Sequence, residues 1–295
     1  MKKIERILVV ADKAKHRQTA VKRAIELGNR TGAHLHIVGF AYSAICEKRD
    51  VFDTHQRRAM KKELLRQRVE DLRAVIRDEG AGALDLDIEP IWEKNIHDWV
   101  VDRAHHQHCD LVIKSVHRTH TLVHTPTDWH LLRECPVPVL LALRVRWPKR
   151  PRILATVDLA HGDRPHTRLN DKVLDAAASF AKVMDAQLHC CFVVELSEVL
   201  TDLDVFDATK YRARIVELAR PRIDAIRERY DIPKSRFHTP TGKSGKAVNA
   251  VADRIKAELV VLGTTARKGV GGFVLGNTAE RVLAKAHTDI LAIKP

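Results

Sequence analysis

The stretch LVVLGTTARKGVGGFVLGNTAE, residues 259–280, is the most informative part of the chain for its fold. An apolar run, residues 259–262, ends abruptly at Gly263, which is how a buried parallel strand meets a turn. A basic, glycine-rich loop follows, and Asn277 or Thr278 then opens a helix. This order predicts an anion site, because backbone N–H groups and the dipole at a helix N-terminus favour phosphate. A glycine-rich surface loop that binds nothing is the alternative.

The elements of this stretch belong to a unit that occurs twice along the chain. Each half begins with a short apolar run that ends in an aspartate, Asp12 or Asp158. An amphipathic helix, a second apolar run and further strand patterns then follow in the same order in both halves. This agreement indicates an internal duplication with a period of about 150 residues. The proline-rich basic linker 146–151 joins the halves, so we expect domains at 1–146 and 151–295.

Alternating apolar strands and amphipathic helices predict an α/β fold. The connections are expected to be right-handed βαβ units, with a parallel sheet covered by helices on both faces. Each half is long enough to bury a core of its own. In the first half the expected strands are 6–11, 34–40, 87–91, 110–114 and 137–143, and the expected helices are 16–31, 53–79, 95–107 and 127–134.

The motif that begins at Gly263 resembles the nucleotide-binding signature of the universal stress protein family. That signature reads Gly-x-x-Gly, nine residues, then Gly-Ser or Gly-Thr. Here Gly263, Ala266, Gly276 and Asn277 take its four named positions, so the spacing is intact and two residue types differ. Ala266 adds a methyl group beside the expected phosphates, whereas an amide and a hydroxyl both cap helices.

The resemblance extends over essentially all 295 residues, and the runs LGNTAE and TPTDWHLLRECP resemble tandem-domain members of the family. It implies two Rossmann-like (adenine nucleotide alpha hydrolase-like) domains, each a five-stranded parallel sheet of order 3-2-1-4-5 flanked by helices. In that order the first and fourth strands are neighbours where the winding reverses, and open α/β sheets bind ligands there. Asp158 ends the first strand and Gly263 ends the fourth, so these two signals are expected to meet in space.

The resemblance also implies a role for each residue of the second-half site. Asp158 would accept hydrogen bonds from ribose hydroxyls, and Arg267 would flank the phosphates. Without a ligand, Asp158 would form an Asx turn and Arg267 would be a solvated loop charge. The full set of expected nucleotide-binding residues is Thr156, Asp158, Val193, Gly263, Ala266, Arg267, Gly276, Asn277 and Thr278.

The first half lacks the signature. Lys114 stands where Gly263 stands, His117 stands where Ala266 stands, and residues 125–129 replace the Gly-Asn helix start. A lysine side chain and a shorter loop without glycine are expected to fill the space that phosphates need. We therefore expect no nucleotide in the first half.

The formal charge of +13 raises the possibility of nucleic-acid binding. Residues 1–148 carry 26 basic and 20 acidic groups, and residues 149–295 carry 25 and 18, so the excess is shared evenly. The two signs are interleaved and aromatic residues are only 5%, so stacking platforms for bases are scarce. This pattern favours a solvated basic surface over a nucleic-acid partner.

The remaining residue counts favour a cytoplasmic chain without a metal. Five cysteines form no framework and are expected to be reduced thiols. The start is a first strand rather than a signal sequence, and no apolar stretch is long enough for a membrane span. His120 and His124 have a spacing that metals accept, but their segment is expected to be a loop, so no metal site is expected.

These observations lead to one expected function and two alternatives. The chain is expected to be a cytoplasmic tandem universal stress protein that binds ATP or ADP, with or without Mg2+, in its second domain and regulates stress survival. A weak ATPase using the same site is one alternative, although no nucleophile–base–acid set is apparent and no catalytic residue is assigned. A nucleotide-free interaction scaffold is the other. The final strands of the two halves are expected to pair as an internal pseudo-dimer, and a homodimer of chains is compatible with this.

Overall fold

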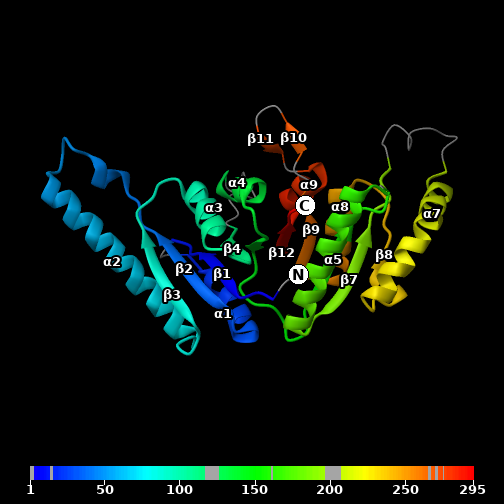
Figure 1. The fold of residues 1–295 in the computed structure, drawn as a ribbon, viewed down its shortest axis with the longest axis horizontal. Coiled ribbons are helices and arrows are strands. Elements are labelled where there is room, and N and C mark those ends of the chain that lie inside the picture. The colour runs from blue at the N-terminus through cyan, green and yellow to red at the C-terminus, as the bar shows by residue number, and fades with distance from the viewer. Residues whose placement is uncertain are drawn as a thin grey trace. The chain divides into compact units, whose positions relative to one another are not determined.

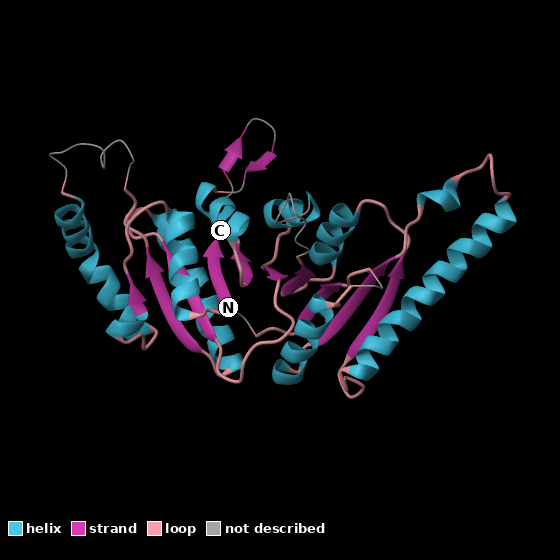
Figure 2. Ribbon diagram, turned by 180° about the vertical axis from the view of Figure 1, so that it is seen from behind, coloured by secondary structure: helices cyan, strands magenta, loops and turns pink. Residues whose placement is uncertain are grey.

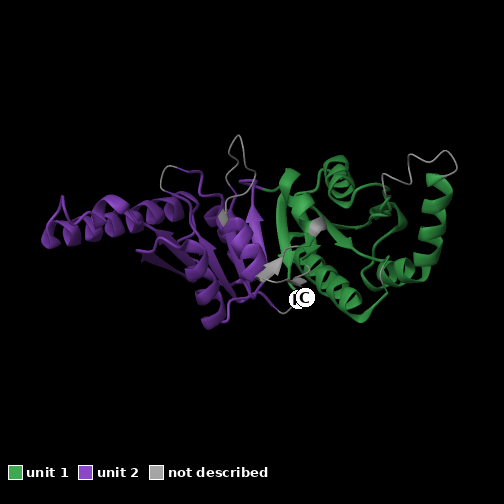
Figure 3. Cartoon of the chain, turned by 90° about the horizontal axis from the view of Figure 1, so that it is seen from above, with its two compact units in different colours: residues 1, 118–124, 147–295 green, residues 2–117, 125–146 purple. Residues whose placement is uncertain are grey.

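The computed structural model describes residues 3–13, 16–116, 126–160, 162–196, 207–264, 267–269, 272–274 and 276–295, without the side chains of 126, 267–269, 272–274, 277 and 278. The described residues form two compact units (Figure 3). The N-terminal unit contains those up to Arg146, and the C-terminal unit contains those from Trp147 onward.

The N-terminal unit alternates strands and helices, as the hydrophobic pattern predicts (Figure 1). Its elements are β1 (Arg6–Val10), α1 (Thr19–Thr31), β2 (His34–Phe40), η1 (Ala44–Glu47), α2 (Thr54–Asp78), β3 (Leu86–Ile91), α3 (Ile96–His106), β4 (Leu111–Ser115), α4 (Pro126–Glu134) and β5 (Val139–Ala142). All its strand pairs are parallel, in the order β3-β2-β1-β4-β5. This is the order that the family resemblance implies.

The C-terminal unit repeats the arrangement. Its elements are β6 (Arg152–Val157), α5 (Arg164–Met184), β7 (Gln187–Phe192), α7 (Ala208–Arg229), η2 (Lys234–Arg236), β8 (Phe237–His238), α8 (Ser244–Ile255), β9 (Leu259–Gly263), β10 (Arg267–Gly269), β11 (Gly272–Val274), α9 (Asn277–Lys285) and β12 (Asp289–Ile293). The parallel strands follow the order β8-β7-β6-β9-β12. The predicted α/β class is therefore confirmed in both halves.

Three local expectations were wrong, each for a physical reason. Helix α1 begins at Thr19 rather than at residue 16, because Gln18 adopts a left-handed conformation and its amide donates to the carbonyl of Asp12. Strand β5 begins only at Val139, after a proline that cannot donate a ladder hydrogen bond. The basic glycine-rich loop contains an antiparallel hairpin, β10–β11, which projects beyond the strands of its unit (Figure 2).

Helices lie close to the sheet at two glycines of the N-terminal unit. A Cβ atom on Gly28 of α1 would lie 3.2 Å from Leu35 of β2. A Cβ atom on Gly39 of β2 would lie 2.7 Å from Nε of Arg68, on α2. Right-handed connections place α1 and α2 on one face and α3 and α4 on the other, and α3 packs against α4.

All five cysteines are buried and none forms a disulfide, as the irregular spacing predicts: Cys46, Cys109, Cys135, Cys190 and Cys191. Burial raises the pKa of the Cys191 thiol to about 12. The pKa of the neighbouring Cys190 thiol is also raised by burial. Both are neutral thiols near pH 7, which makes them part of the core rather than reactive nucleophiles.

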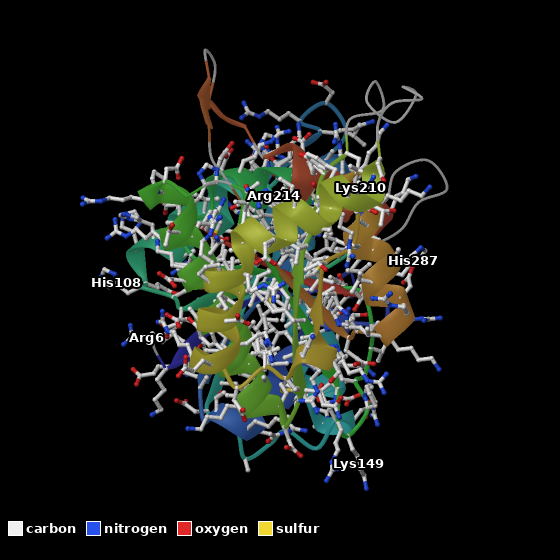
Figure 4. The ribbon with its side chains drawn as sticks, turned by 90° about the vertical axis from the view of Figure 1, so that its right-hand side faces the viewer. Arg6, His108, Lys149, Lys210, Arg214 and His287 are labelled. Atoms are coloured by element: carbon white, nitrogen blue, oxygen red, sulfur yellow. The ribbon has the colours of Figure 1, made fainter. Side chains whose placement is uncertain are left out.

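The positive charge is dispersed over the surface, in line with the interleaved signs of the sequence. Lys210 and Arg214, both on α7, are exposed (Figure 4). Further along the same helix Arg220 and Arg227 pair with acids three residues before them, Glu217 and Asp224. Such pairs are typical of a solvated helix face. No helix among the described residues is long and apolar enough to cross a membrane.

Two histidines stack where the short strand β8 joins the sheet, and they make stability depend on pH. The rings of His189 and His238 lie 5.4 Å apart between centroids, and Nδ1 of His189 is 3.1 Å from Nε2 of His238. Desolvation, followed by the charge of His238, lowers the pKa of His189 from 6.5 to about 4. The unfolded chain therefore binds more protons than the folded chain between these two pH values, and stability falls as pH drops from 6.5 towards 4.

We expect acidification from pH 7 to pH 5 to remove about 2 kcal/mol of stability through this histidine. A His189→Gln variant should lose correspondingly less over the same interval, because it has no imidazole to protonate. Urea denaturation of both proteins at the two pH values measures the difference. Equal losses of stability in the two proteins would show that the pKa of His189 is not lowered by folding.

Candidate functional site

The candidate site begins where the pairing between β6 and β9 stops. The two strands pair only up to Ala155 and Val261, whereas β6 continues to pair with β7 as far as Val157 and Phe192. At the end of the shorter ladder, Thr156 donates from its hydroxyl to the carbonyl of Val261 at 3.2 Å. The first and fourth strands of this unit therefore meet at their carboxyl ends as predicted, at the point where open α/β sheets bind ligands.

Asp158 follows β6 directly, and its backbone is held by a residue that the sequence patterns did not indicate. The side chain of Asn170, on α5, accepts from the Asp158 N–H at 3.0 Å and donates to the Asp158 carbonyl at 2.7 Å. One carboxylate oxygen of Asp158 accepts from the N–H of Ala160 at 3.0 Å. The Asx turn considered as an alternative therefore forms, on a half-buried side chain at the strand end.

Gly263 ends β9, and helix packing is sufficient to require a glycine there. A Cβ atom at this position would lie 2.7 Å from Cγ and Cδ2 of Leu169, on α5. Leu169 is itself buried, so a larger residue would push α5 away from the sheet. The glycine thus lets α5 approach the strand end, independently of any ligand.

The N-terminus of α9 is the best-defined anion-binding feature of the site. Gly276 is its N-cap, with φ −63° and ψ 142°, and as a glycine it supplies no side-chain cap. Helix α8 anchors α9, because a Cβ on Gly245 would lie 2.7 Å from the carbonyl carbon of Arg281. Asn249 donates to the carbonyl of Val282 at 3.1 Å. The N-terminus of α9 is therefore carried by a closely packed helix pair.

The other expected residues fall on the loop and on the neighbouring strand. Val193 lies directly after β7 and is half-buried. Ala266 lies outside the described residues. Arg267 begins β10, and Asn277 and Thr278 open α9, with side chains outside the described part. The backbone thus brings Thr156, Asp158, Val193 and Gly263 to the carboxyl ends of three adjacent strands.

The corresponding place in the N-terminal unit is closed by a buried polar network. Strand pairing between β1 and β4 runs one residue further than in the other unit, to Val10 and Lys114. The hydroxyl of Ser115 donates to the carboxylate of Asp12 at 2.6 Å and accepts from the N–H of Ala20 at 2.7 Å. Asp12 is only 6% exposed, so it is a structural acid rather than a surface group.

The strand register overturns the expected match of Lys114 with Gly263. Ile7 pairs with Leu111 as the equivalent Ile153 pairs with Leu259, so Lys114 corresponds to Leu262 and Ser115 to Gly263. Nζ of Lys114 lies 2.7 Å from Oδ1 of Asp128, in the first turn of α4, and donates to the Ser115 carbonyl at 2.9 Å. The side chains of Lys114 and Asp128 are 10% and 0% exposed, so a buried carboxylate pairs with a buried lysine beside the strand end.

The histidine-rich segments do not form a metal centre within the described part of the chain. No group of three or more His, Cys, Asp or Glu residues there is placed to hold a metal ion. The rings of His97 and His130 stack with their centroids 4.2 Å apart, and Nδ1 of His130 lies 3.3 Å from Oε1 of Glu134. His120 and His124 lie outside the described residues.

The sequence profile of the universal stress protein family matches residues 3–142 and 151–294. The two matches cover nearly the whole chain and agree with the repeated strand order described above. The chain belongs to the universal stress protein family, with two copies of the family's domain in tandem.

Within that family the similarity is to universal stress protein E. The chain is 30% identical to universal stress protein E of Salmonella typhi, over 99% of this chain and 94% of that protein. It is 29% identical to the Escherichia coli K12 protein of the same name, with the same coverage. The tandem type indicated by LGNTAE and TPTDWHLLRECP is therefore confirmed.

Two solved structures share the fold over nearly the whole chain. A functionally unknown protein from Pseudomonas aeruginosa PAO1 superposes with a TM-score of 0.75 at 25% identity, covering 99% of this chain and 93% of that one. A universal stress protein from Archaeoglobus fulgidus superposes with a TM-score of 0.65 at 14% identity, covering 100% and 99%. The second similarity concerns the fold alone.

Proposed function

We propose that this tandem universal stress protein binds ATP or ADP in its second domain, residues 151–295, and acts in a cytoplasmic stress response through the bound nucleotide. The observation that carries the proposal is the N-terminus of α9, whose N-cap is Gly276 and so brings no side chain over the first N–H groups. It follows the basic loop after β9, the strand that neighbours β6 and Asp158. Backbone N–H groups at such a helix end bind phosphate without needing a particular side chain.

The first domain, residues 1–146, has a different role in this proposal. Its Asp12 is buried under Ser115, and its Lys114 already has a carboxylate partner. Neither group is available to ribose or phosphate without breaking a buried interaction. We therefore assign one nucleotide to each chain, with Mg2+ entering only as a companion of the phosphates. The expected pairing of the last strands of the two halves, and a homodimer of chains, stay predictions.

Two observations favour the nucleotide-free scaffold as a second candidate. The Asp158 carboxylate already accepts from the N–H of Ala160, and packing against Leu169 alone accounts for Gly263. The two candidates differ in what the purified protein carries. Mass spectrometry of the supernatant from denatured protein should detect ATP or ADP, and added ATP should raise the melting temperature. A protein that releases no nucleotide and shows no thermal shift would support the scaffold instead.

A further inference from the structure

A small basic cavity lies in the N-terminal unit, away from the strand ends that form the candidate nucleotide site. It has a volume of about 180 Å3. Its lining comes from η1, from the first two turns of α2 and from the residue that follows β3: Cys46, Glu47, Thr54, Arg57, Arg58, Lys61 and Trp92. We call this cavity, with Trp92 and the three cations Arg57, Arg58 and Lys61, the basic pocket.

The three cations of the basic pocket have no carboxylate partner within ion-pair distance among the described residues. Arg57 donates to the hydroxyl of Thr54 at 3.2 Å, and its Nε is buried without an acceptor. Arg66, further along α2, pairs in the usual way with Glu63 at 2.6 Å and also with Glu70. Arg57 is half-buried, whereas Arg58 and Lys61 are exposed, and within the described part of the chain all three lack the carboxylate partners that Arg66 has.

The position of these cations is electrostatically unfavourable in the empty protein. Arg57, Arg58 and Lys61 lie at i, i+1 and i+4, so two like charges face each other on one helix surface. The acid at this end of the helix, the N-cap Asp53, accepts from the N–H of Gln56 and caps the helix. The like-charge penalty is relieved when an anion occupies the cavity.

The aromatic wall of the pocket is fixed in place. Trp92 donates from its indole N–H to Glu47 at 3.0 Å, and the ring of Tyr42 lies 5.6 Å from it between centroids. Nζ of Lys61 lies 5.2 Å from the centre of the Trp92 ring. The Glu47 carboxylate is thus engaged by the indole, and Lys61 is within reach of both the ring and the cavity.

From these contacts we infer that the basic pocket binds the phosphate group of a small phosphate monoester, with the ester group against Trp92. Arginine forks match phosphate oxygens in a bidentate manner, and lysine adds a point charge. The cavity is smaller than the roughly 300 Å3 at which drug-sized ligand sites begin, so it suits a phosphoryl group and the atoms next to it. The inference does not depend on the proposed nucleotide site.

Calorimetric titration of the full chain with phenyl phosphate and with inorganic phosphate tests the inference. We expect both probes to bind, with phenyl phosphate tighter because its ring contacts Trp92. Arg58→Gln and Lys61→Gln should each weaken binding of both probes by about tenfold or more. Trp92→Leu should remove the preference for the ester. Lys62→Gln is the matched control, because it removes an exposed cation of the same helix outside the pocket, and it should change affinity less than twofold.

A readout without ligand accompanies the titration. Arg58→Gln should raise the melting temperature of the ligand-free protein, since it removes a like charge near the helix N-terminus. Failure of phosphate to bind the wild type, or equal loss in Lys62→Gln, would overturn the inference. The titrations are repeated in Gly276→Val, where unchanged phosphate binding separates this pocket from the proposed nucleotide site. Loss of phosphate binding in that variant would place the phosphate at the nucleotide site and overturn the inference.

Discussion

Replacement of Asp128 by alanine is expected to destabilise the N-terminal unit by about 3 kcal/mol or more. The change would leave the Nζ of Lys114 buried without the carboxylate that now lies 2.7 Å away. Removal of one member of a buried ion pair is far more harmful than removal of both, because an uncompensated charge remains in the interior. Thermal denaturation should show a melting temperature lower by roughly 10 °C for the N-terminal unit.

The double variant Lys114→Met with Asp128→Ala provides the control. It removes the charge together with its partner, so it should recover most of the lost stability. Recovery would identify the stranded lysine, rather than a cavity at position 128, as the cause of the loss. A single variant that melts within about 2 °C of the wild type would contradict the buried pair.

The second large effect is expected at the other end of the chain, where Gly276→Val should weaken ATP binding by about 100-fold or more. A β-branched side chain at the N-cap would cover the first N–H groups of α9. Loss of two hydrogen bonds to a charged phosphate corresponds to about 3 kcal/mol or more, hence the size of the effect. The fold should persist, because φ −63° and ψ 142° are extended values that valine also adopts.

Gly82→Val is the matched control for this substitution. Gly82 is exposed, lies in the N-terminal unit, and has no atom within 4 Å of the position of a Cβ. The Gly82→Val substitution should leave both the melting temperature and the affinity for ATP unchanged. Full ATP affinity in a folded Gly276→Val protein would show that the N-terminus of α9 does not bind the phosphates.

The sequence was sufficient for the fold because two kinds of pattern agreed. Alternating strands and helices indicate a parallel sheet, and their repetition shows that one unit occurs twice. The position of Asp158 beside the end of β9 follows once the strand order that the family resemblance implies is added. The hairpin β10–β11 was missed because three-residue strands with glycines give almost no periodic signal.

The contacts at the two strand ends could not be predicted from the sequence, because they join residues that are far apart along the chain. No local pattern indicates that Asn170 will hold the backbone of Asp158, or that Leu169 will require a glycine at 263. The loss of the signature in the first half was visible, but the match of Lys114 with Gly263 was one residue out, and its partner Asp128 was not indicated. Such contacts arise from tertiary packing, and they cannot be predicted from the residue types and spacing of one segment.

The most direct test of the central claim, one nucleotide per chain in the second domain, is calorimetric titration of the full protein with ATP. The same titration in Lys61→Gln, which weakens the basic pocket, separates any phosphate bound there from the proposed nucleotide site. We expect saturation near one ATP per chain, abolished by Gly276→Val and retained in Gly82→Val. Two equivalent sites per chain, or no binding at all, would contradict the assignment.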